Sequence, residues 1–153
     1  MDPLSITTSI IAVLQATNAV ISVCYDYSTA VKDSSWELPR VTEEVKSLRN
    51  VLEALEQLAK KAESADQSAK TQLPTLRLLC EPDVGPLVMC LAEMEALEKK
   101  LTPPSWSGRV GSKRRALVQA LSWPLREGDT KKILENIGRF KVTLNLAMTV
   151  DQA

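Results

Sequence analysis

Hydrophobic positions recur at helical spacing in four long stretches of the chain. The first, from Pro3 to Tyr25, carries no charge, and the second runs from about Trp36 to Ala65 with apolar residues at heptad-like steps. The same pattern returns from Pro86 to Leu101 and from about Asp129 to Met148. Steps of three and four residues place side chains on one face of a helix. The pattern therefore predicts an all-α fold.

A fifth, shorter helix is predicted from Lys113, with Leu117, Val118 and Leu121 as its apolar members, ending at Trp123-Pro124. Prolines separate the other stretches. A chain of 153 residues suits one domain with one core. We therefore expect a single helical bundle of four to five helices spanning residues 1–153.

The first stretch is predicted to be the central hydrophobic helix of this bundle. Asp2 and Pro3 are suited to the N-cap and first helical position. The aliphatic positions that we assign to a membrane-active or core face are Leu4, Ile6, Ile10, Ile11, Val13, Leu14, Val20 and Ile21. A second face is small or polar, and would let another backbone approach closely; it comprises Ser5, Thr8, Ala12, Gln15, Ala19 and Ser22.

Two interpretations of this helix remain open. Its uncharged length approaches the ~20 residues of a membrane span. Gln15, Asn18 and several Ser and Thr residues make it only marginally hydrophobic, however, so a buried bundle helix is equally suited to the sequence. The two are compatible if the helix is buried at rest and released later. Asp2 stands where a secretory signal would carry basic residues, so we expect the segment to be retained.

The later stretches predict the partners of the first helix in a shared core. The second stretch forms either a bundle helix or, less in keeping with its charged flanks, a coiled-coil dimer seam. Gly138 lies inside the last stretch, where glycine costs up to ~1 kcal/mol relative to alanine. The predicted core members are Leu48, Leu52, Leu55, Leu91, Met94, Ile137, Phe140 and Leu144.

Charge is distributed unevenly although the formal net charge is zero. The segment from Lys99 to Lys141 holds eleven basic and three acidic residues, and the remainder holds eight basic and sixteen acidic ones. Such a segment is typical of a surface that meets anionic lipid or nucleic acid, or of a solvated helix face. Little aromatic interleaving disfavours nucleic acid. The residues that we assign to anionic-lipid binding are Lys113, Arg114, Arg115, Lys131 and Lys132.

Catalytic chemistry is not indicated by the sequence. The chain has no histidine, which removes Ser-His and Cys-His nucleophile pairs and imidazole metal sites. Gly108 to Lys113 lacks the spacing of a phosphate-binding loop. Cys24, Cys80 and Cys90 lie among apolar residues without metal-ligand spacing, and their odd number indicates a reducing compartment. We expect no enzyme activity, cofactor, metal or small-molecule substrate, and a cytoplasmic resting location.

Three blocks of sequence resemble one protein family. MDPLSITTSIIAVLQ resembles the start of the HeLo-like N-terminal domains of fungal STAND (NLR-like) receptors. GPLVMCLAEMEALEKKLTP resembles the third helix of that family, and ALSWPLREGDTKKILENIGRFKVTLNLAM resembles its tryptophan-proline turn and closing helix. Together the blocks extend over essentially the whole chain.

The resemblance implies a bundle similar to HeLo domains and to the four-helix bundle of mixed-lineage kinase-like pseudokinases. Those domains attack membranes when a following nucleotide-binding module clusters them. It implies a cell-death effector that self-associates and moves from the cytoplasm to anionic lipid of the plasma membrane, with no nucleic-acid partner. The alternative that we keep open is a non-lytic adaptor that binds partner helices or its own copies.

Overall fold

The computed structural model describes residues 4–30, 37–64, 85–102 and 125–152. These residues form four α-helices, namely α1 (Leu4–Ala30), α2 (Glu37–Ser64), α5 (Pro86–Leu101) and α7 (Glu127–Gln152), and contain no strand. The prediction of an all-α bundle with an apolar N-terminal helix is confirmed. The fifth helix predicted from Lys113 and the cap at Asp2 and Pro3 lie outside the described residues.

The boundaries of α5 follow from its terminal residues. Gly85 is extended, Pro86 occupies the first helical position, and the missing N–H of proline costs nothing there. Lys99 and Lys100 stand in the last turn, where positive charge is favourable. The Thr102 N–H then donates to the Glu98 carbonyl at 2.9 Å and closes the helix. The predicted range for this helix is therefore confirmed.

Helix α2 gains support from its own charged surface. Glu37 lies in its first turn and Lys61 in its last, both favourable to the helix dipole. Arg49 pairs with Glu53 at 3.6 Å and Lys60 with Glu56 at 3.7 Å, each one helical turn apart. Exposed pairs of this kind contribute only about 0.3–0.5 kcal/mol each. Burial of the apolar stripe must therefore supply most of the stability of α2.

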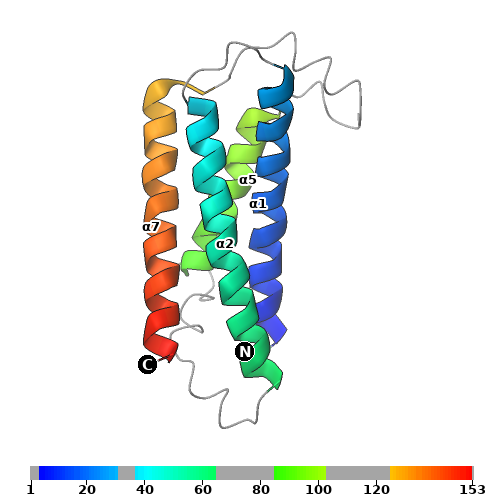
Figure 1. The fold of residues 1–153 in the computed structure, drawn as a ribbon, viewed down its shortest axis with the longest axis vertical. Helices are drawn as coiled ribbons and strands as arrows, with labels where there is room; N and C mark the ends of the chain where they lie inside the picture. Colours follow the sequence, from blue (N-terminus) through cyan, green and yellow to red (C-terminus); the bar gives the residue numbers. More distant parts are fainter. Residues whose placement is uncertain (1–3, 31–36, 65–84, 103–124, 153) are drawn as a thin grey trace.

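The four helices lie roughly side by side and alternate in direction along the chain (Figure 1). Helix α1 packs against α2 and α5, α2 also packs against α7, and α5 and α7 share a smaller contact. The first turn of α1 and the last turn of α7 lie at the same end of the bundle (Figure 1).

One hydrophobic core joins all four helices. Leu48, Leu52 and Leu55 of α2 are fully buried, and Ile137 of α7 meets them in the same cluster. Of the other predicted core members, Met94 and Leu144 are buried, and Leu91 and Phe140 pack half-buried against the cluster. The single-bundle prediction is confirmed. Because the heptad-like stripe of α2 is buried against the other helices of the same chain, the alternative of a coiled-coil dimer seam at that stripe is wrong.

Candidate membrane-contact site

Helix α1 is long and apolar enough to cross a membrane. Its window from Thr7 to Ser28 covers 22 residues with a mean hydropathy of 1.5, and half of that window is buried in the bundle. Length and composition alone do not separate a membrane helix from a core helix, since both pass the same test. The packing of each side chain has to decide what the helix offers in the folded state.

The aliphatic face of α1 is directed into the core. Ile10 and Val20 are completely buried, and Val13 and Leu14 are also buried. Ile21 packs half-buried against the same core. Ile11 is exposed, at 37%. The side chains of Leu4 and Ile6 lie outside the described set. In the closed bundle, four of the eight residues assigned to membrane contact are therefore unavailable to lipid.

Polar groups on α1 are satisfied within the fold. The buried Thr17 hydroxyl donates to the Val13 carbonyl at 2.7 Å, which removes the cost of burying it. The buried Tyr27 hydroxyl donates to the Leu101 carbonyl at 2.9 Å and so joins the C-terminal ends of α1 and α5. Asp26 also lies within α1, so the helix continues past the uncharged stretch. The closed position of α1 is thus specified by hydrogen bonding as well as by burial.

The small face of α1 borders an open groove. Ala12, Gln15 and Ala19, three of its predicted members, line the groove from the α1 side, together with Ala16. Leu91, Glu95 and Glu98 line it from α5. Small side chains permit this close approach of the two helices, as the sequence predicts. The acidic rim contributed by α5 is not foreseeable from the pattern of either helix alone.

Detaching α1 from the bundle carries a large free-energy cost. Each buried Val, Leu or Ile side chain contributes about 1.5–3 kcal/mol, so releasing this face costs on the order of 10 kcal/mol. That is comparable with the about 5–15 kcal/mol by which whole domains are stable. An isolated chain in water therefore keeps α1 buried, and release requires the same side chains to be buried again elsewhere.

The residues assigned to anionic-lipid binding are only partly described. Lys113, Arg114 and Arg115 lie outside the described residues. Lys131 and Lys132 are exposed on α7, and Lys131 pairs with Glu127 at 3.7 Å. Asp129 and Glu135 are exposed on the same helix. The described part of the basic segment is consequently a mixed-charge surface.

Polar contacts fix α7 to its neighbours, and the sequence pattern does not reveal them. The buried Thr130 hydroxyl donates to the Glu37 carboxylate at 3.0 Å, with the Arg126 carbonyl as a second acceptor at 3.1 Å. Lys141 Nζ lies 2.9 Å from Glu44 Oε2 and donates to the Ser47 hydroxyl at 3.3 Å.

A further contact joins α7 to α5, where the Asn136 amide donates to the Glu93 carboxylate at 3.1 Å. The partners in these contacts between helices are 43 (Asn136 and Glu93) to 97 (141 − 44) residues apart in sequence, so only the fold brings them together.

The described cysteines are buried thiols without a catalytic partner. Burial raises the pKa of Cys24 to about 11, against a smaller opposing effect of its hydrogen bond with Thr42. Burial, with a smaller contribution from Glu93, raises the pKa of Cys90 to about 12. Both are therefore neutral and unreactive near neutral pH. Burial is confirmed for these two; Cys80 lies outside the described residues. Within the described ranges, no cluster of three or more acidic or cysteine side chains is placed to hold a metal.

These features define a helical bundle domain that sequesters an apolar N-terminal helix. Residues 1–151 match the family described as "Pigment biosynthesis cluster protein PigL N-terminal", and the chain belongs to that family. The family is related to the fungal HeLo-like N-terminal domains. No curated protein and no solved structure matches the chain.

Proposed function

We propose that this domain is the N-terminal effector or signalling domain of a fungal NLR-like receptor, and that clustering moves it from the cytoplasm to anionic membrane. The observation that carries the proposal is α1, a helix whose stretch up to Tyr25 carries no charge, which is long enough to span a membrane, and whose aliphatic face is buried in the core. The relation of its family to HeLo-like domains supports the same assignment. The family description names an N-terminal region and a pigment biosynthesis cluster, and specifies no reaction.

The proposed mechanism has two contributions at the membrane. Basic residues near an anionic leaflet contribute about 1 kcal/mol each, which favours recruitment. Inserting α1 then buries in lipid the side chains that leave the core, which offsets the cost of opening the bundle. Clustering adds contacts between copies, and small residues such as Ala12 and Ala19 suit close helix contacts in lipid.

A non-lytic adaptor is the second candidate function. The observation that favours it is the nearly complete burial of Ile10, Val13 and Val20 in the closed bundle. In that case α1 remains in place, and the output passes through surfaces that the closed bundle already exposes.

A direct experiment separates the two functions. Residues 1–153 are fused to an inducible oligomeriser, and we expect clustering to produce dye leakage from anionic liposomes and movement to the plasma membrane with loss of viability. Clustered protein that never leaks dye and stays in the cytoplasm would exclude the effector function. Partner binding by that unchanged bundle would then support the adaptor.

A variant in the first turn of α1 tests insertion itself. Replacing Leu4 and Ile6 by Ser shortens the apolar span at an end of the helix where fraying limits the effect on the core. We expect a modest loss of stability, retained clustering, and leakage reduced at least about tenfold. A matched control places Ser at two exposed apolar positions of another helix, Val88 and Met89 of α5. Full leakage by the α1 variant would show that insertion of this end of α1 is not the step that permeabilises the membrane.

A further inference from the structure

The outer face of α7 carries a regular stripe of exposed positions. Their spacing alternates between four and three residues, the 3.5-residue period of a coiled-coil seam. We define the outer stripe as Gly128, Lys132, Glu135, Arg139, Val142, Leu146 and Thr149, all of them exposed. Val142 and Leu146 are the most exposed aliphatic side chains of the described core-forming helices, at 67% and 62%. The stripe has helix-packing geometry, and none of the other described helices packs on it.

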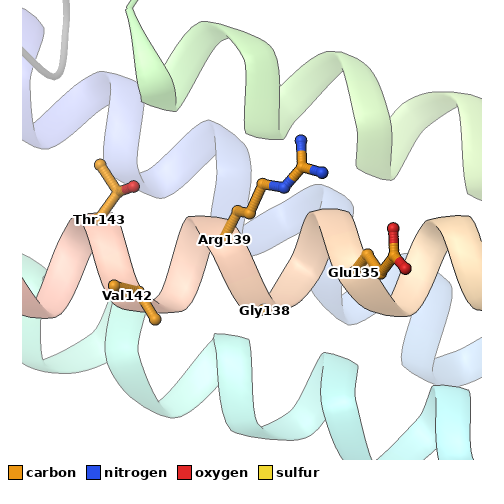
Figure 2. A pocket seen from close by; sticks show the side chains of 5 residues that line it. All are labelled: Glu135, Gly138, Arg139, Val142 and Thr143. Carbon is orange, nitrogen blue, oxygen red and sulfur yellow. The ribbon is translucent and has the colours of Figure 1, made fainter.

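A notch lies in the middle of the outer stripe. It is lined by Glu135, Gly138, Arg139, Val142 and Thr143, and four of these are spaced as the hole that receives one knob in coiled-coil packing. Figure 2 shows Glu135 on one side of Gly138 along α7, with Arg139 and Val142 on the other side. The notch exists because Gly138 has no side chain.

The folded chain itself does not require this glycine. A Cβ placed on Gly138 meets no atom within 4 Å, and the same holds for Gly128 at the start of the stripe. Glycine inside a helix costs up to ~1 kcal/mol relative to alanine. Close approach of another helix is a physical use for a glycine at such a position.

The charges of the stripe complement each other in one particular register. Among the described residues, neither the Glu135 nor the Arg139 side chain has a hydrogen bond or ion pair, although the two residues are one turn apart. If a second α7 packs antiparallel about a two-fold axis level with residue 137, Glu135 of each copy faces Arg139 of the other. The Glu135 knob then enters the notch over Gly138.

The same register pairs four further stripe positions with each other. Leu146 lies over Gly128 of the second copy, and Val142 lies against the aliphatic stem of Lys132. A surface that is complementary to itself in this way is what a two-fold symmetric dimer requires. We propose that the outer stripe of α7 is a self-association surface, on which a second copy of this chain docks its own α7 in antiparallel orientation.

The expected contact is weak for free chains. One helix pair buries less than the roughly 1,200–2,000 Å² of stable complexes. Clustering raises the effective concentration of neighbouring copies into the millimolar range, where such a contact forms. The inference rests on the proposed self-association for its biological use, but it leaves α1 in place and requires no membrane.

Charge reversal tests the register in the full 153-residue chain. Self-association is measured by sedimentation velocity up to millimolar concentration, without lipid. R139E creates two Glu–Glu contacts across the axis and should weaken association about tenfold or more, whereas E135R/R139E restores opposite charges and should return it close to the wild-type value. K100E, at an exposed site on α5, serves as the matched control and should leave association unchanged.

Gly138→Ala supplies an independent readout. Filling the notch should weaken association at least about threefold while raising the midpoint of thermal unfolding, since alanine is the better helix former. A variant that merely unfolds would show the opposite thermal shift. A wild-type chain that stays monomeric, a dimer insensitive to R139E, or a swap that fails to restore association would each overturn the proposal. If clustered protein leaks dye but its association does not depend on the outer stripe, the self-association surface is wrong and the effector function stands. If association depends on the outer stripe but no dye leaks, the effector function is wrong and the self-association surface stands.

Discussion

At the scale of single residues, two buried hydroxyl groups fix the ends of different helix pairs. Tyr27 joins α1 to α5 through the Leu101 carbonyl, and Thr130 joins α7 to α2 through the Glu37 carboxylate. Removing either donor leaves a buried acceptor with one partner fewer. The acceptor is a neutral carbonyl in the first contact and a carboxylate in the second, and the two contacts restrain different helices.

Y27F and T130V form a matched pair of variants. Each should lower the free energy of unfolding by about 1–2 kcal/mol, measured by chemical denaturation. If α1 is the helix that leaves the bundle, Y27F should increase dye leakage by clustered protein more than T130V does at equal destabilisation. Equal leakage from both would show that general instability, and not release of α1, controls membrane activity.

The cysteines give a second prediction at this scale, concerning alkaline pH. In the native state the Cys24 and Cys90 thiols titrate near 11 and 12, against 9.0 when exposed. Above pH 9 the unfolded chain therefore binds fewer protons than the native chain, and stability falls as pH rises. The slope approaches about 1.4 kcal/mol per pH unit for each thiol.

Denaturation measured from pH 8 to pH 11 checks this sign. The C24A/C90A variant should lose that part of the slope, although it starts from a lower stability because each change leaves a small cavity. A slope that is unchanged in the double variant would contradict the burial of these thiols.

At the scale of helices, the sequence predicts the buried face and the range of a helix correctly where the pattern along that helix alone determines them. The leucines of α2 recur every three or four residues, and that period alone predicts the buried face and its role in the core. The range of α5 follows from Pro86 and the basic last turn. Helix α7 begins at Glu127, two residues before the predicted start near Asp129, and both acidic residues lie in its first turn, where negative charge is favourable to the helix dipole.

Contacts between helices could not be predicted in the same way. Nothing in the local pattern around Lys141 selects Glu44 as its partner over other carboxylates, since the choice depends on the rotation and register of two packed helices. The same applies to the carboxylates beside the small face of α1. The outer stripe of α7 could not be predicted from the hydrophobic pattern because only Val142 and Leu146 among its members are aliphatic, and only their exposure in the folded chain distinguishes these two from core positions.

At the scale of the whole molecule, the single core predicts cooperative protection of α1. Amide hydrogens of α1 between Ile10 and Tyr27 should exchange only on global unfolding of the free chain, because no part of this helix can leave without opening the core. In clustered protein on anionic vesicles, we expect the exchange pattern of α1 to change first. Hydrogen exchange followed by mass spectrometry resolves this. A pattern in α1 that is identical before and after membrane binding would favour the adaptor function.

The position of the chain ends has a mechanical consequence. Because α1 begins and α7 finishes at the same end of the bundle, a force applied between residues 4 and 152 peels each of these helices away from α2 and α5 starting at that end, and does not slide them along their length (Figure 1). Peeling breaks contacts one turn at a time, so we expect the domain to open at low force in an optical trap. A force that acts on α7 alone, between neighbouring copies of the chain, would not pull on α1 and would leave it packed in the bundle.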